Sequence, residues 1–115
     1  MKKNDSVYLG HILDSIERIE EYTEGMEKAD FLSSNLVQDG TIRQIEIIGE
    51  ATKNLSMGLR EKYIHIPWKD IAGMRDRLIH HYFGVDLKAV WNSVKVDIPA
   101  LKDEITSIID TLEIE

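Results

Sequence analysis

Apolar residues recur at intervals of three and four along most of this chain of 115 residues. The pattern is clearest over residues 7–19 and 42–55, and it returns after residue 86. This spacing places apolar side chains on one face of an α-helix, whereas alternation of the strand type is absent over any useful length. The sequence therefore predicts an all-α fold, an up-down bundle of four main helices joined by short connections and helical turns.

The expected helices follow from this spacing and from the residues that begin and end helices. We expect Asn4, Asp5 or Ser6 to cap the first helix and Gly25 to end it. Asn35, Asp39 and Thr41 are alternative caps for the second, and Gly84 is the expected end of the third. The four helices are predicted over residues 7–24, about 36–56, 68–83 and 86–112, with a restart or kink at Asp97 and Pro99 and short turns near residues 31–32 and 59–63.

Composition limits the class of protein. The chain contains no cysteine, which excludes disulfide frameworks, thiolate zinc sites and cysteine nucleophiles. Its length suits one hydrophobic core, so residues 1–115 are predicted to form a single domain. No apolar run approaches the roughly 20 residues of a membrane span, and the first residues lack the apolar stretch of a signal peptide. We therefore expect a cytoplasmic protein without membrane contact.

The predicted helix over residues 68–83 departs from the amphipathic pattern. Its apolar face would contain Arg75, a charge that must be paired, reach solvent at an edge or point into a cleft. Asp76 and His80 share another face at i, i+4, a spacing at which a carboxylate can hold an imidazole in one tautomer. Gly73 on that face would allow close approach of another backbone.

On an ideal helix Arg75 and His80 point roughly 140° apart. Two copies related by a two-fold axis would bring both residue types to a shared cleft, so we expect a homodimer. A second interpretation remains open, because Arg and His near a helix C-terminus are also common on solvated faces, where they favour the helix dipole.

At these residues the chain resembles the HepT-like branch of the HEPN ribonuclease toxins. Residues 66–86, Ile-Pro-Trp-Lys-Asp-Ile-Ala-Gly-Met-Arg-Asp-Arg-Leu-Ile-His-His-Tyr-Phe-Gly-Val-Asp, contain the family's Arg-x-x-x-x-His-x-Tyr signature at Arg75, His80 and Tyr82. Residues 43–51 are also similar to the family. The resemblance implies a homodimeric HEPN-like bundle that cuts RNA without a metal or cofactor. It also implies a MntA-like nucleotidyltransferase antitoxin that silences the toxin by transferring AMP to Tyr82.

The chemistry of RNA cleavage matches these side chains. Attack of the ribose 2′-OH on the adjacent phosphate needs proton transfer near neutral pH, which His80 can supply. It also needs stabilisation of negative charge, for which the planar donors of Arg75 are suited. Asp76 is expected to orient His80, and the product would be a 2′,3′-cyclic phosphate. AMP on Tyr82 would add bulk and negative charge beside Arg75, although a tyrosine that anchors the helix end in the core fits the sequence equally.

Two further sets of residues leave alternatives open. Arg43 and Glu46, at i, i+3, are interpreted either as a structural ion pair or as support for the site. Glu61 with His65 and Asp76 with His80 have unspecific i, i+4 spacings, so no metal site is predicted. The main alternative function is a non-catalytic HEPN module that binds nucleotide and docks a nucleotidyltransferase. An inert dimerising bundle is disfavoured by Arg75 in the apolar face.

The net charge of −7 argues at first against a nucleic-acid partner. The charge is uneven, however, because residues 53–81 hold six basic and three acidic side chains and three of the four histidines. We therefore expect RNA to bind a small cationic cleft on an otherwise acidic body, weakly and with strong salt dependence.

Overall fold

The structure, a computed structural model, describes residues 3–80 and 84–114. Two long antiparallel helices, α1 (Lys3–Thr23) and α3 (Asn35–Lys53), pack side by side along most of their lengths. The short helix α2 (Lys28–Leu32) connects them, and α4 (Met57–Lys62) follows α3. The turns predicted near residues 31–32 and 59–63 are therefore confirmed as short helices.

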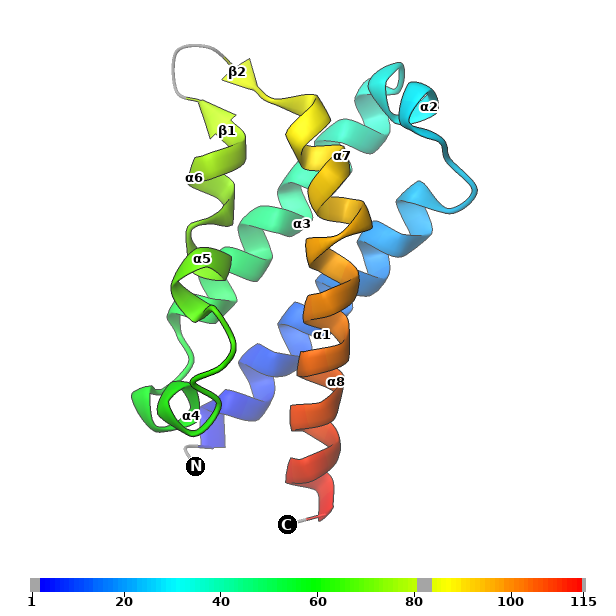
Figure 1. Cartoon of the computed structure of the whole chain (residues 1–115). Helices are drawn as coiled ribbons and strands as arrows, with labels where there is room; N and C mark the ends of the chain where they lie inside the picture. Colours follow the sequence, from blue (N-terminus) through cyan, green and yellow to red (C-terminus); the bar gives the residue numbers. More distant parts are fainter. Residues whose placement is uncertain (1–2, 81–83, 115) are drawn as a thin grey trace.

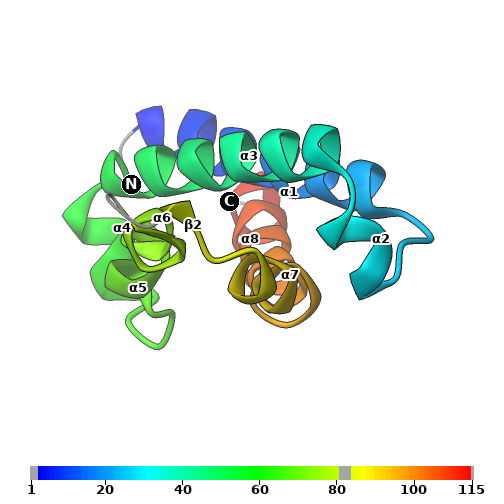
Figure 2. The same ribbon diagram turned by 90° about the horizontal axis from the view of Figure 1, so that it is seen from above.

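The remaining elements form a second layer beneath the α1–α3 pair, as the view from above shows (Figure 2). The chain passes through α5 (Trp68–Ala72) and α6 (Met74–Leu78), which pack against α3. It then continues through strands β1 (Ile79–His80) and β2 (Gly84–Val85) into α7 (Leu87–Lys95) and α8 (Asp97–Ile114). In Figure 1, α7 and α8 follow one another along nearly one line, which confirms the predicted restart near residue 97. The fold is the expected all-α bundle, apart from the two short strands.

The apolar stripes predicted from the sequence form the core between the layers. Side chains from α1, α3 and α8, including Ile12, Ile48 and Ile105, are fully or almost fully buried there. The ring of Phe31 in α2 packs at a tilt of 35° against that of Trp91 in α7, with ring centroids 5.3 Å apart. Burial of this apolar surface is the main force that holds the short helices against the long ones.

Several helix caps differ from the sequence expectation. Ser34, rather than Asn35, Asp39 or Thr41, caps α3 by accepting a hydrogen bond from the backbone N–H of Val37. Asp5 lies within α1 and is buried; its carboxylate accepts hydrogen bonds from the backbone N–H and the hydroxyl of Ser56, at 2.8 and 2.6 Å. Ser56 in turn caps α4. Thus Asp5 connects α1 to the start of α4 instead of capping α1.

Other expected ends are confirmed. Helix α1 ends at Thr23, shortly before Gly25, which adopts a left-handed φ of 72°. Asp86 caps α7 by accepting a hydrogen bond from the backbone N–H of Ala89 at 3.1 Å. At the far side of the bundle, Lys102 of α8 donates a 2.8 Å hydrogen bond to Glu20 of α1, and this bond raises the pKa of Lys102.

The single helix predicted over residues 68–83 is wrong. Gly73 separates α5 from α6 with φ −94° and ψ 4°, and α6 ends at Leu78 because Ile79 is extended. The carbonyl of Leu78 accepts a hydrogen bond from the backbone N–H of Asp86 at 2.9 Å, so it is satisfied without a further helical turn. Ile79 pairs with Val85, and His80 with Gly84, whose φ of 78° suits glycine at this turn.

Gly49, rather than Gly73, provides the close backbone approach. A Cβ atom on Gly49 would lie 3.1 Å from the carbonyl oxygen of Ala72, at the contact between α3 and α5. The absence of a side chain lets α5 sit directly on α3. None of the helices in the described ranges is both long and apolar enough to cross a bilayer.

Candidate functional site

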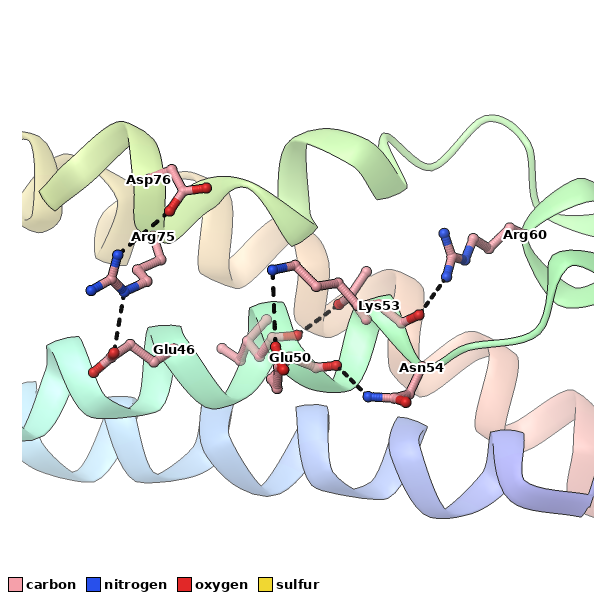
Figure 3. Close-up of polar contacts among 9 residues, drawn as sticks. Glu46, Glu50, Lys53, Asn54, Arg60, Arg75 and Asp76 are labelled. Carbon is pink, nitrogen blue, oxygen red and sulfur yellow. Dashed lines mark hydrogen bonds and ion pairs between the residues drawn. The ribbon is translucent and has the colours of Figure 1, made fainter.

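Arg75 lies in the first turn of α6 and extends toward α3 (Figure 3). Its Nε donates to the carboxylate of Glu46 at 3.2 Å, and its Nη1 lies 3.5 Å from the carboxylate of Asp76. The side chain is 47% exposed, although Met74 and Leu78 of the same short helix are buried. Arg75 is therefore not inside an apolar face as the sequence suggested. It is a paired guanidinium at the surface, one of the arrangements that the sequence left open.

Glu46 contacts α6 rather than its own helix neighbour. Within residues 3–80 and 84–114 no ion pair joins Arg43 to Glu46, so the interpretation as a structural pair is wrong. Glu46 instead joins α3 to α6 across 29 residues of sequence. Arg43 is exposed one turn before Glu46 on α3. Glu46 therefore contacts Arg75, whereas Arg43 makes no ion pair or hydrogen bond with any residue of the described ranges.

A pocket of about 470 Å³ lies over α3, and its lining includes residues of α1 on one side and Arg75 of α6 on the other. We call it the Arg75 pocket. Arg43, Glu46 and Arg75 line it, so the structure brings together three residues that the sequence singled out. Of the six other lining residues, Ile47, Glu50 and Ala51 belong to the family-like stretch 43–51, whereas no role was predicted for Tyr8, His11 and Asn54.

Two of those residues form an aromatic pair on α1. The rings of Tyr8 and His11 lie edge to face, with centroids 6.1 Å apart. Tyr8 is partly buried against the core, and His11 is exposed. The signal in the sequence was their i, i+3 spacing at the border of the apolar stripe of α1, which brings two rings to one edge of the helix.

The carboxylates of the Arg75 pocket both have cationic partners. Glu46 is paired with Arg75, and Glu50 lies 3.9 Å from Nζ of Lys53. Figure 3 shows these contacts in a row along α3, with the side chain of Asn54 donating to the backbone carbonyl of Glu50 at the far end. Arg43 is the cation of this lining that makes no ion pair or hydrogen bond within the described part of the chain.

The other predicted site residues are described only in part. The backbone of His80 lies in β1, two residues after α6 ends, and its side chain falls outside the described part of the structure. His81 and Tyr82 also lie outside the described residues. Because α6 ends at Leu78, the helical geometry expected for His80 does not hold. The expected i, i+4 contact of His80 with Asp76 and its expected angle to Arg75 both assumed one continuous helix, so neither applies to a residue in β1.

A second pocket, of about 300 Å³, lies on the other side of α5 and α6, against α8. We call it the Arg77 pocket. Arg77 Nη2 donates to the backbone carbonyl of Asp70 at 3.4 Å, and His65 Nε2 lies 3.0 Å from the carboxylate of Glu104. Ile71, Met74 and Leu101 provide apolar surface between these polar groups. Arg75 and Arg77 are two positions apart in the sequence, yet they line different pockets.

In the described part of segment 53–81, the three arginines face different surfaces rather than the single cationic cleft expected from the sequence. The guanidinium of Arg60 donates to the backbone carbonyls of Lys53, the last residue of α3, and of Leu55 just beyond it. Arg77 lines the second pocket. Among the described residues no group of three or more imidazole or carboxylate side chains is placed to hold a metal ion.

The chain matches the HepT-like ribonuclease family over residues 12–108. It is 58% identical over 113 residues to a Methanocaldococcus jannaschii protein named "Gamma-glutamylcyclotransferase and putative RNase". That match covers 98% of this chain and 51% of the relative, so the chain spans about half the length of this relative.

Other relatives match over most of their length. A "Putative RNase" of Methanocaldococcus jannaschii is 42% identical over 112 residues, covering 97% of this chain and 93% of the relative. A "Probable ribonuclease HepT" of Thermococcus cleftensis is 47% identical over 102 residues, covering 89% and 93%. No solved structure matches the chain with significance.

Proposed function

The chain belongs to the HepT-like ribonuclease family, and from this premise we propose that it is a metal-independent endoribonuclease, the toxin of a toxin–antitoxin pair. The observation that carries the proposal is the position of Arg75. Its guanidinium lies at an open pocket and is held by carboxylates that remain in contact with solvent. A phosphate group of RNA can replace such partners, because the planar donors of arginine fit phosphate oxygens as well as carboxylate oxygens.

In this mechanism the 2′-OH of the ribose attacks the adjacent phosphorus, and the bond from phosphorus to the 5′-oxygen of the next nucleotide breaks. His80 transfers the proton, since imidazole titrates near neutral pH. Arg75 stabilises the negative charge that develops on the phosphorane. The products are a 2′,3′-cyclic phosphate and a 5′-hydroxyl end.

Glu46 and Asp76 act on Arg75 as positioning residues. Asp76 was expected to orient His80, and its contact with Arg75 supports a role in holding the guanidinium instead. Glu46 holds the same guanidinium from α3. Two carboxylates on different helices thus limit the directions in which Arg75 can point.

Control of this activity follows the same chemistry. A MntA-like nucleotidyltransferase antitoxin transfers AMP from ATP to the hydroxyl of Tyr82. A bond forms between that oxygen and the α-phosphorus, and pyrophosphate leaves. The added phosphate repels RNA near Arg75. The protein acts in the cytoplasm as a homodimer in which both copies contribute to the cleft.

The direct test uses purified protein, treated with EDTA, and RNA labelled at its 5′ end. We expect cleavage with 2′,3′-cyclic phosphate ends in the wild type, and its loss in His80→Ala at unchanged melting temperature. A wild type that leaves RNA intact while binding its nucleotidyltransferase would contradict the proposal and support the docking module instead.

Regulation and assembly have separate tests. Mass spectrometry of the protein produced with its nucleotidyltransferase should find AMP on Tyr82, and Tyr82→Phe should remain unmodified. Sedimentation at micromolar concentration should give a dimer. A strict monomer would contradict the shared cleft.

A further inference from the structure

The Arg75 pocket extends well beyond the residue that gives it its name. Along α3 its lining runs from Arg43 to Asn54, which corresponds to about 16 Å at the rise of an α-helix. Its volume of about 470 Å³ lies within the roughly 300–1,000 Å³ of pockets that hold small organic ligands. One phosphate at Arg75 leaves most of this space unused, so the rest of the lining is available to another part of the ligand.

The charges of the lining favour a second phosphate at Arg43. Glu46 and Glu50 are already paired with Arg75 and Lys53, so neither carboxylate reaches Arg43 as a partner. Arg43 is exposed and makes no ion pair or hydrogen bond within the part of the chain that the structure describes. An unpaired guanidinium about one turn from the Glu46–Arg75 pair is well placed for a neighbouring phosphate of the same strand.

The opposite wall of the pocket is aromatic. Tyr8 packs against the hydrophobic core, and its ring also contacts the ring of His11 edge to face. Ile47 and Ala51 of α3 add apolar surface to the lining. Aromatic side chains beside cationic ones are the usual means by which proteins bind single-stranded nucleic acid, because every base has a face that stacks.

We propose that the Arg75 pocket contains a nucleotide subsite for single-stranded RNA, in which Tyr8 and His11 bind a base beside the scissile phosphate and Arg43 binds a flanking phosphate. This inference rests on the proposed RNase function for its substrate. It assigns binding residues on α1 and α3, outside the segment of residues 66–86 that carries the catalytic signature.

The test measures binding separately from cleavage. The probe is a fluorescein-labelled, single-stranded 2′-O-methyl RNA, which cannot be cleaved because its 2′ oxygen is blocked. Fluorescence anisotropy gives its Kd at several salt concentrations. The variants are Tyr8→Leu, Tyr8→Phe and Arg43→Gln. Arg18→Gln is the control, an exposed arginine of α1 that lines neither pocket.

Each variant has its own expected signature. Tyr8→Leu should weaken binding about tenfold, because stacking of one base on an aromatic side chain contributes about that factor. The salt dependence should not change, whereas Tyr8→Phe should bind as the wild type does. Arg43→Gln should lower the slope of log Kd against log salt by about 0.7, the value for one phosphate contact on a single strand. Arg18→Gln should change neither quantity.

Cleavage assays then separate this inference from the proposed function. If the wild type cleaves RNA and neither Tyr8→Leu nor Arg43→Gln alters binding, the subsite is wrong and the RNase remains. If both variants weaken binding but the wild type does not cleave, the subsite stands and the RNase is wrong. If the variants alter only the sedimentation coefficient, the pocket is an interface between two copies, and the subsite is wrong. Because Arg43 is exposed, Arg43→Gln remains informative even if Tyr8→Leu fails to fold.

Discussion

Two arginines of the same short helix meet different surroundings. Arg75 faces a pocket with aromatic and polar walls and is held by two carboxylates. Arg77 faces a pocket with more apolar lining and donates to a backbone carbonyl, that of Asp70. A carboxylate at the surface can give up its guanidinium to a phosphate, whereas the carbonyl contact of Arg77 fixes it to α5. The comparison indicates that position in the fold, and not residue type, makes Arg75 the candidate for RNA cleavage.

The largest effect on cleavage should appear when each arginine is replaced separately by glutamine and the two variants are compared. Arg75→Gln is expected to lower kcat/KM for RNA cleavage by about 10²- to 10³-fold, as when one charge-stabilising donor is removed from an active site. Arg77→Gln, which removes the same charge two positions away, is expected to retain activity within about threefold, a factor that corresponds to well under 1 kcal/mol. Initial rates on one labelled RNA measure both. Equal losses in the two variants would mean that α6 contributes only general positive charge.

This difference between the arginines was not accessible from the sequence. Apolar residues at spacings of three and four continue through Ile79 and Tyr82, so the pattern predicts a helix that extends beyond Leu78, where α6 ends. The actual end depends on the hydrogen bond from Asp86 to the carbonyl of Leu78. That contact joins residues eight positions apart beside the β1–β2 pair, so the local apolar pattern does not reveal it.

The long helices were predictable because their apolar stripes are long, although the residues expected to cap α1 and α3 were not the ones that do. Residues 7–24 and 36–56 were placed within a few residues of α1 and α3, and Asp86 was identified correctly as a cap. The contact of Glu46 with Arg75 joins residues 29 positions apart, and Tyr8 lies farther still from Arg75 in the sequence. Periodicity indicates which face is buried, but it does not say which exposed residues of two helices meet.

Gly49 allows a test of how closely α5 must pack on α3, the contact that places the two pockets on opposite sides of α5 and α6. Gly49→Val should destabilise the fold by about 1–3 kcal/mol, the usual range for overpacking, because its Cβ alone would lie 3.1 Å from the carbonyl oxygen of Ala72. Thermal unfolding measures this change. Gly10→Ala is the matched control. A Cβ at Gly10 meets nothing within 4 Å, so the gain in helix propensity should stabilise the protein by about 0.5–1 kcal/mol. An unchanged melting temperature in Gly49→Val would show that α5 can shift without cost.

A smaller effect is expected at Glu46, which holds Arg75 from α3. Glu46→Gln should lower kcat/KM by up to about fivefold, since partly exposed ion pairs contribute about 0.2–1 kcal/mol. The double variant Glu46→Gln/Arg75→Gln should be no less active than Arg75→Gln alone, because Glu46 acts through Arg75. Asp70→Asn is the control on the other side of α6, because Arg77 contacts the backbone of Asp70. Additive losses in the double variant would assign Glu46 a role independent of Arg75.

The smallest effect should occur in the Arg77 pocket, where His65 and Glu104 form an exposed pair between the α4–α5 connection and α8. Glu104→Gln should reduce the free energy of unfolding by less than about 1 kcal/mol, as for other surface pairs. The difference from the wild type should shrink in 1 M NaCl, where charges are screened over about 3 Å. RNA cleavage should be unchanged, because no residue of this pair lines the Arg75 pocket. A loss of cleavage in Glu104→Gln at full stability would mean that the two sides of α6 are coupled, and that the Arg77 pocket participates in the reaction.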